Sequence, residues 1–302
     1  MLLRPSLRPA PDEGLIGTPE AADGPQKRNR RKLVRRVVIV AAIVFASIVL
    51  VVGIGVAVIM LMARESASPF RFGQALEQYK ALQRRDTKDP SSLAAPGVYT
   101  YTTSGSESAS APGLPSSSYS YPHTTTMTVY SSGCGQDWRW QPLDSRYEDL
   151  FVCRAPDGAL MLRSRSDAEA FYGVTDTRTF ACQAGSTWMP ARSLKGQTFS
   201  GTCTNGGNKN SGGMSIAYTG KVAGEGLVDV GGASVKAVHV TLDESFTGDT
   251  EGTGSASIWI DSSTGFLLKE SRNETSKSKS VVGWVPSSES FTIALDSLSP
   301  TR

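Results

Sequence analysis

Histidine and cysteine are scarce in this sequence of 302 residues, which contains two histidines and four cysteines. The cysteines stand 19, 29 and 21 residues apart, whereas a structural zinc site usually includes a closely spaced pair. The chain also lacks a nucleophile elbow, a Walker loop and a dinucleotide-binding fingerprint. We therefore expect no enzymatic activity, no cofactor and no metal ion, although the many serines leave open a triad assembled in space.

Most of the chain carries no net positive charge. Residues 96–302 contain 16 Lys and Arg against 20 Asp and Glu, a balance of −4, whereas residues 1–95 contain 15 against 8, a balance of +7. The formal net charge of +3 therefore originates near the N-terminus. Because a nucleic-acid-binding domain carries its basic patch on the folded part, the sequence argues against a nucleic-acid partner.

One long segment lacks both charge and proline. Residues 37–62 form an uninterrupted apolar run of 26 residues. A helix of this length extends about 39 Å, and about 20 residues suffice to cross the hydrocarbon core of a bilayer. The apolar region of a cleaved signal peptide is only about 7–15 residues long, and Ala63-Arg64-Glu65 is a poor cleavage site. The sequence therefore predicts a transmembrane helix that acts as a signal-anchor.

The two flanks of this segment differ in charge. Residues 27–36 carry seven cations, whereas residues 63–80 carry three, which Glu65 and Glu77 offset. Cations resist translocation and bind the anionic lipids of the cytoplasmic leaflet. We therefore expect a single-pass protein of the cell membrane with a cytoplasmic N-terminus and an extracytoplasmic C-terminal domain. Small residues spaced four apart in the helix would also allow it to form a homo-oligomer, although such residues are common in membrane helices.

The composition divides the chain into four parts. Residues 1–36 are basic and rich in proline, which predicts a disordered cytoplasmic tail, and residues 37–62 form the membrane helix. Residues 63–97 contain the pair Ser68-Pro69, which can cap a helix. The sequence therefore predicts a short juxtamembrane helix over residues 70–85, followed by a linker. Residues 98–302 form the predicted extracytoplasmic domain, which is large enough to bury its own core.

The predicted outer domain alternates between short β-rich runs and clusters of Gly, Ser, Asn, Asp and Pro, a pattern typical of antiparallel sheets. Gly231-Gly232 supplies a hairpin turn. The helix pattern in this part covers only Asp167 to Tyr172, and residues 105–118 are predicted to form a mobile loop. We therefore expect a mainly β fold, in which an antiparallel curved sheet forms a half-barrel, a barrel or a sandwich.

All four cysteines, Cys134, Cys153, Cys182 and Cys203, lie in the predicted outer domain. Disulfides persist outside the cytosol, so their position agrees with the predicted orientation. Four cysteines allow three pairings. We favour Cys134–Cys153 and Cys182–Cys203, because each would join neighbouring strands. A loop of about 20 residues contributes about 3 kcal/mol per bridge.

Aromatic side chains gather in the first third of the outer domain. The candidates to face a ligand are Tyr99, Tyr101, Tyr130, Trp138 and Trp140. Aromatic residues that line a concave sheet form sites for apolar ligands, peptides or sugars. The alternative is an ordinary hydrophobic core with a few aromatic residues at its edge.

Acidic residues gather around a predicted hairpin turn at Asp243, Glu244, Asp249 and Glu251. Carboxylates are the ligands that calcium prefers, but these positions lack the spacing of a known calcium loop. We interpret them as a solvated acidic turn. The adjacent acids Glu148-Asp149 point to opposite faces of a strand, so they cannot share a catalytic site.

The segment Ser257–Lys269 (SIWIDSSTGFLLK) combines a strand that ends in aromatic-hydrophobic-Asp, a Thr-Gly turn and a return strand. This hairpin resembles the LolA/LprG-like superfamily of envelope lipoproteins and lipid carriers, and Pro96–Tyr101 is similar to their opening strand. The resemblance covers about 20 of the 302 residues and implies a half-barrel sheet around a lipid-binding cavity. The chain departs from that family because its apolar run is followed by no lipobox cysteine, and few helices are predicted to cover the concave face. The composition also resembles uncharacterised bitopic membrane proteins of high-GC Gram-positive bacteria.

Two functions agree with these features. The first is a membrane-anchored extracytoplasmic binding module for an envelope lipid, a glycan or a protein partner. The second is a non-enzymatic structural subunit of a cell-envelope complex, and an envelope hydrolase is a third alternative. A deep apolar cavity would favour the first function, and a filled core with a flat apolar patch would favour the second. Two carboxylates facing each other in a cleft would favour the third.

Overall fold

The computed structural model describes residues 26–62, 67–83, 93–207, 212–280 and 283–302. The chain separates into two compact units, Met1–Val56 and Ala57–Arg302. Most of the predicted tail (1–25) and most of the predicted linker (84–92) lie outside the described residues.

The first unit contains most of helix α1, Gln26–Met62. Within this helix, Arg35–Gly55 has a mean hydropathy of 3.2 and exposed side chains, so it is long and apolar enough to cross a membrane. The same length and composition occur in membrane-spanning helices and in some signal sequences. The helix begins inside the segment that the sequence assigned to a disordered tail, because Lys, Arg and Gln are good helix formers and the apolar run continues the helix.

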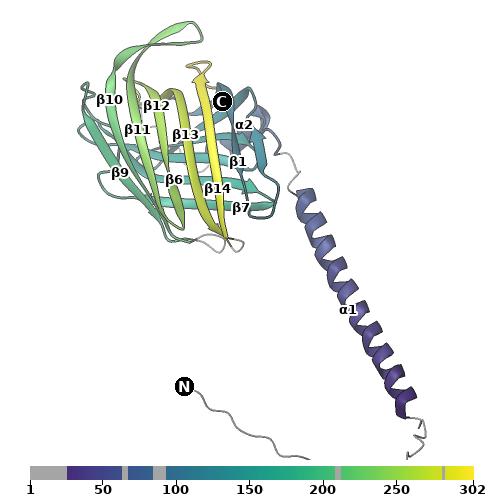
Figure 1. Ribbon diagram of the computed structural model, residues 1–302. Helices are drawn as coiled ribbons and strands as arrows, with labels where there is room; N and C mark the ends of the chain where they lie inside the picture. Colours follow the sequence, from purple (N-terminus) through teal and green to yellow (C-terminus); the bar gives the residue numbers. More distant parts are fainter. Residues whose placement is uncertain (1–25, 63–66, 84–92, 208–211, 281–282) are drawn as a thin grey trace, which may run out of the picture. The chain divides into compact units, whose positions relative to one another are not determined.

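The predicted juxtamembrane helix is present as α2, Phe72–Gln83. Its residues Ala75 and Tyr79 lie one turn apart on the same face and are fully buried. They form a small apolar cluster with Val98, whose neighbour Tyr99 belongs to the main core on the other face of the sheet. Helix α2 therefore packs against the outer face of the sheet, near its first strand (Figure 1).

The second unit is built from antiparallel strands, of which the described residues contain fourteen. They are β1 (Gly97–Ala109), β2 (Ser117–Ser120), β3 (Thr124–Ser132), β4 (Gly135–Leu143), β5 (Arg146–Arg154), β6 (Leu160–Phe171), β7 (Val174–Cys182), β8 (Thr187–Met189), β9 (Thr198–Asn205), β10 (Met214–Val230), β11 (Ala233–Gly248), β12 (Thr250–Asp261), β13 (Leu267–Ser280) and β14 (Gly283–Leu295).

The sheet closes on itself. From β14, the hydrogen-bonded neighbours run through β13, β12, β11, β10, β9, β7, β6, β5, β4 and β3 to β1, and β1 pairs with β14 through Tyr101↔Leu295 to Ala109↔Ser287. These twelve strands of the described domain form a barrel (Figure 1), while β2 pairs with β1 and β8 pairs with β6. The predicted mainly β antiparallel fold is confirmed, and the closed barrel is the form that it takes.

The predicted helix over Asp167 to Tyr172 is wrong. These residues complete strand β6, which pairs with β5 on one side and β7 on the other. The backbone then reverses at Tyr172 and Gly173, which both have positive φ (55° and 73°) and form a tight hairpin turn. The ladder to β7, together with the end of the ladder to β5 at Asp167 and Ala168, outweighs the weak helical preference of a six-residue segment.

The strands are longer than the sequence predicted. Strand β1 continues to Ala109 and β2 begins at Ser117, so half of the predicted loop at 105–118 is regular sheet. The hairpin between β10 and β11 turns at the predicted Gly231-Gly232, where both residues have positive φ. Closure gives each of the twelve strands a hydrogen-bonded neighbour on both sides, although residues 224–230 of β10 pair with β11 alone.

Both predicted disulfides are confirmed. Cys134–Cys153 joins the region around β4 to β5, and Cys182–Cys203 joins β7 to β9. The pairing of β7 with β9 consists of only two residue pairs, Ala181↔Thr204 and Cys182↔Cys203, so this is the shortest contact between neighbouring strands of the ring. The second disulfide therefore joins the two neighbouring strands of the ring, β7 and β9, that share the fewest backbone hydrogen bonds. We call their contact the β7–β9 seam.

One end of the barrel interior is apolar. Trp138 lies at its centre, where it contacts Trp188 and Phe266 edge-on with ring centroids 6.4 and 5.4 Å apart. Phe266 in turn packs on Tyr99 at 4.6 Å. Edge-to-face contacts of this kind contribute beyond the area that they bury, so this cluster anchors the core.

Candidate functional site

The other end of the barrel interior is charged. Glu270, Arg272 and Glu274 alternate along β13 and point inward, as do Arg165 and Asp167 on β6. Side chains two residues apart share a face of a strand, so the alternation that points apolar side chains into the barrel also points these charged side chains inward. Charged side chains that are removed from water need a partner of opposite charge, and most of these side chains have one.

An inner network of ion pairs crosses the barrel. Arg165 contacts Glu148 at 3.1 Å and Glu244 at 2.9 Å. Arg272 contacts Glu244 at 2.9 Å and Glu270 at 2.8 Å. These five side chains come from β5, β6, β11 and β13, so the network joins strands that are not neighbours in the sheet.

The arginines determine the ionisation of Glu148. Burial alone would raise the pKa of this carboxyl group, but Arg165, Arg272 and Arg146 outweigh it and lower the pKa to about 2. The carboxylate is therefore charged at every physiological pH, and it holds the two guanidinium groups in place.

An outer network lies nearer to the end of the barrel. Arg146 contacts Glu107 at 3.3 Å and Glu289 at 3.1 Å. The Tyr121 hydroxyl is within hydrogen-bond reach of the same two carboxyl groups, at 3.2 Å from Glu107. Burial raises the pKa of Glu107 to about 7, against the opposing effect of Arg146. Glu107 and Glu289 therefore share one arginine, and Glu107 changes its protonation near neutral pH.

A third group of ions involves Arg178 on β7. Its guanidinium contacts Asp176 at 2.7 Å and Glu169 at 3.3 Å. Asp167 lies in the same region but forms no hydrogen bond or ion pair with a described residue. Burial raises the pKa of Asp167 to about 6, although Arg178 and Arg165 oppose the shift.

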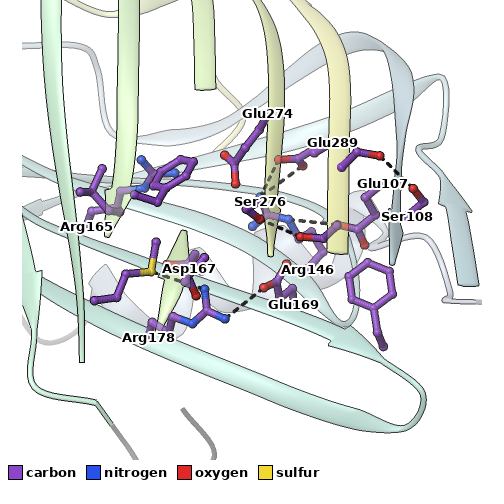
Figure 2. A pocket seen from close by; sticks show the side chains of 17 residues that line it. Glu107, Ser108, Arg146, Arg165, Asp167, Glu169, Arg178, Glu274, Ser276 and Glu289 are labelled. Carbon is purple, nitrogen blue, oxygen red and sulfur yellow. Dashed lines mark hydrogen bonds and ion pairs between the residues drawn. The ribbon is translucent and has the colours of Figure 1, made fainter. Parts of the chain in front are cut away.

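These groups surround a space that we call the charged hollow (Figure 2). Water could occupy about 40 Å³ of it, which is room for one or a few molecules. Its ionisable lining residues are Glu107, Arg146, Arg165, Asp167, Glu169, Arg178, Glu274 and Glu289. They come from two groups of neighbouring strands, β5–β7 and β13–β14 with β1, which the closed barrel brings together.

Glu274 is the least satisfied of these residues. Figure 2 shows its carboxyl group pointing into the charged hollow, and it forms no hydrogen bond or ion pair with a described residue. Burial and the nearby charge of Glu289 raise its pKa to about 8. Glu274 is therefore largely protonated at neutral pH unless a positive group enters the charged hollow.

The structure places four of the five predicted ligand-facing aromatics, Tyr99, Tyr101, Trp138 and Trp140, in the core of the barrel, where each is at least nine-tenths buried. Tyr130 is half-buried beside the small cluster under α2. Their role in ligand binding stays a prediction. Trp138 and Trp140 do line a second hollow with water space of about 20 Å³, next to the inner ion pairs.

The prediction that the acidic residues around the β11–β12 turn are all exposed to solvent is wrong for Glu244. Glu244 is 6% exposed and pairs with Arg165 and Arg272 inside the barrel. It lies between the buried residues Leu242 and Phe246 on the same face of β11, and that alternation was the signal in the sequence. Among the described residues no group of three or more His, Cys, Asp and Glu is placed to hold a metal ion.

The two histidines lie apart from the charged hollow. His239 stacks on Trp259 with ring centroids 4.4 Å apart, and its Nε2 is 2.8 Å from the Ser257 hydroxyl. His123 is exposed in the loop before β3. The predicted opposite orientation of Glu148 and Asp149 is confirmed, since the first contacts Arg165 inside and the second contacts Arg139 in a separate pair at 2.6 Å.

No protein-family model matches the chain, and no curated protein sequence matches it. Among solved structures, the hypothetical lipoprotein YmcC from Escherichia coli (K12) is 12% identical over 74% of this chain and 97% of its own, with a TM-score of 0.32. An exported protein with a YmcC-like fold from Bacteroides fragilis is 10% identical over 68% and 96%, with a TM-score of 0.30. A DUF1329 family protein from Desulfovibrio piger is 11% identical over 76% and 94%, with a TM-score of 0.19.

These solved structures are distant from the chain. Two of them are described as a lipoprotein or an exported protein, which is a description of those proteins and not of this chain. At such TM-scores and identities the similarity carries no residue roles and no ligand. The function must therefore come from the residues of this chain.

Proposed function

We propose that this protein is a membrane-anchored extracytoplasmic binding module that holds a polar partner, a glycan or a protein of the cell envelope, at the charged end of its barrel. Helix α1 supplies the anchor, and the cations that precede its apolar stretch support a cytoplasmic N-terminus. The two disulfides support an oxidising environment for the barrel.

The charged hollow is the observation that carries this proposal. Binding sites are concave and contain a few converging polar groups that determine specificity. Here carboxyl and guanidinium groups from six strands converge at one end of a barrel that two disulfides cross-link. A purely structural barrel would gain more stability from well-packed apolar residues of similar volume at these positions, so the buried ions favour binding.

A lipid is the partner that this geometry supports least. A site that encloses a ligand of drug size needs about 300 Å³ or more, and it is mostly apolar. The three hollows described inside the barrel offer water space of about 40, 20 and 10 Å³, and charged residues line each of them. The proposal therefore keeps a glycan or a protein as the partner.

A structural subunit is the alternative function, and the packed apolar end of the barrel favours it. Trp138, Phe266 and their neighbours fill that end, and a rigid barrel suits a role in assembly. Under this alternative the partner would contact the outer face of the barrel, and changes in the charged hollow would not affect it.

Native mass spectrometry of the full chain, extracted in mild detergent and combined with lipid and glycan analysis, tests the proposal. We expect a co-purifying protein or glycan that is lost when Ser276→Phe fills the charged hollow. Thr275→Phe is the matched control, because Thr275 is exposed and lies next to Ser276 on the opposite face of β13. Retention of the partner by the Ser276→Phe variant would favour the structural alternative, and a bound lipid with no other partner would contradict the proposal.

A further inference from the structure

Negative charge exceeds positive charge in the charged hollow. Its lining contains five carboxyl groups and three guanidinium groups. Of the three arginines, Arg165 is already engaged by Glu148 and Glu244, which lie outside the lining. The hollow is therefore short of positive charge by at least two, which a buried site tolerates only by binding protons or cations.

The unpartnered atoms are aimed at this space. Glu107 is only 3% exposed, and its Oε1 accepts no hydrogen bond from a described residue, while its Oε2 faces Arg146 and Tyr121. Glu274 and Asp167 likewise have no hydrogen bond or ion pair within the described part of the chain. A buried acceptor that is left without a donor costs about 1–3 kcal/mol, so Glu107 Oε1 favours a donor from outside. The half-buried carboxyl groups of Glu274 and Asp167 offer further acceptors beside it.

The size and the lining of the hollow select the donor. Its water space of about 40 Å³ admits a group the size of a water molecule but not a bulky ring. Serine hydroxyls line it beside the carboxyl groups, including Ser276 and Ser287. An ammonium group carries three N–H donors and no acceptor, which suits a lining that offers carboxyl and hydroxyl oxygens.

We propose that the charged hollow binds a primary ammonium group at the end of a flexible chain, the group that a lysine side chain of a protein and an ethanolamine substituent of a glycan share. This inference rests on the proposed function, because it names the chemistry of the partner at the same site. The ammonium group donates to the carboxyl groups of the charged hollow, first of all to Glu274, and replaces the proton that Glu274 otherwise holds. Binding therefore lowers the raised pKa of Glu274.

Calorimetric titration of the full chain in phosphatidylcholine nanodiscs tests the inference, since that headgroup carries no primary amine. The two probes are Nα-acetyl-lysine methylamide and glycerophosphoethanolamine, each compared with its N-acetylated form. We expect at least one amine to bind, acetylation to weaken it by about tenfold or more, and Glu274→Gln to weaken it by about fivefold. The tighter of the two amines identifies the source of the group.

Glu225→Gln is the matched control, because Glu225 is an exposed carboxylate of β10, and we expect it to leave the affinity unchanged. Asp167→Asn provides a second variant with the same expected loss if Glu274→Gln fails to fold. Equal binding of the acetylated probes, or no binding of either amine up to about 10 mM, would overturn the inference. If the co-purifying partner still depends on the hollow in that case, the proposed function stands without it.

Discussion

The apolar and charged ends of the barrel interior are built by the same strands. On β11, Val238 and Val240 belong to the apolar end, whereas Glu244 belongs to the charged end. On β14, Ile293 lies in the core and Glu289 lines the charged hollow. The alternation of inward and outward side chains therefore continues along each strand through both ends of the barrel, and only the type of the inward residue changes from apolar to charged.

The two ends differ in how their burial is stabilised. The apolar end gains from removing carbon surface from water, a contribution that does not depend on pH. The charged end depends on pairing, and three of its carboxyl groups have raised pKa values, so its stability depends on protons. The apolar end therefore supports the fold at any pH, and the charged end is the part to which we assign the proposed binding.

The largest expected effect comes from Arg272→Ala at the charged end. This change leaves Glu244 and Glu270 buried without their shared partner, which we expect to lower the free energy of unfolding by about 3–5 kcal/mol at pH 8. Glu244 keeps Arg165 as a partner, but Glu270 does not. Burial raises the pKa of Glu270, so the loss should be smaller at pH 5, where Glu270 can bind a proton more readily. Urea unfolding at both pH values measures it, and the exposed Arg163→Ala is the control with little effect.

At the apolar end, Leu160→Ala should cost about 2–5 kcal/mol, because Leu160 is fully buried and its removal leaves a cavity. The cost should be the same at pH 5 and pH 8, unlike that of Arg272→Ala. Leu227→Ala is the control, since Leu227 is 67% exposed. A clear pH dependence of the Leu160→Ala cost would show that the two ends are not independent.

Removal of Cys182–Cys203 by a double change to alanine should cost about 3 kcal/mol, the contribution of a loop of about 20 residues. Hydrogen exchange should then accelerate mainly in β7 and β9, which share only two residue pairs. The corresponding removal of Cys134–Cys153 should cost a similar amount without opening that seam. Equal protection of β7 and β9 in the two variants would contradict this account.

Glu274→Gln should stabilise the barrel by about 1–3 kcal/mol at pH 8, by relieving an unpartnered buried carboxylate. Its folded pKa of about 8 lies above the ordinary 4.5, so the group favours folding below pH 4.5, and this contribution is lost as the pH rises through 8. The advantage of the variant should therefore shrink towards pH 5. Thermal unfolding across this range measures it, and a destabilised variant at pH 8 would contradict the assignment.

The smallest effect is expected from Glu251→Gln on the outside of the barrel. Glu251 and Lys277 form an ion pair at 2.9 Å, as close as the inner pairs, but their side chains are about half exposed. Solvent screens such pairs, so we expect a change below about 0.5 kcal/mol that vanishes in high salt. A cost comparable to that of Arg272→Ala would remove the distinction between the inside and the outside.

The local features of the fold could be predicted from the sequence. Gly231-Gly232 identified a hairpin, and the positions of the four cysteines identified neighbouring strands. These features depend on residues close together in the chain, or on turn chemistry that few residue types satisfy. The closure of β1 onto β14 joins residues about 180 positions apart, and no local pattern encodes it.

The charged end could not be found by treating every charged residue as exposed. Glu244 lies between Leu242 and Phe246 on the buried face of β11, so the alternation contained the information. Its partners Arg165 and Arg272 come from other strands, and their proximity follows only from the closed ring. Sequence analysis therefore located the strands but not the site that they enclose.

The titration of Glu274 tests the central claim most directly. Carbon-13 NMR of the full chain with labelled glutamate, without added amine, would follow each carboxyl group from pH 4 to pH 9. The account predicts one resonance that titrates near pH 8 and disappears in the Glu274→Gln variant. If every glutamate titrated below about pH 5, the end of the barrel would not be short of positive charge, and the account would be contradicted.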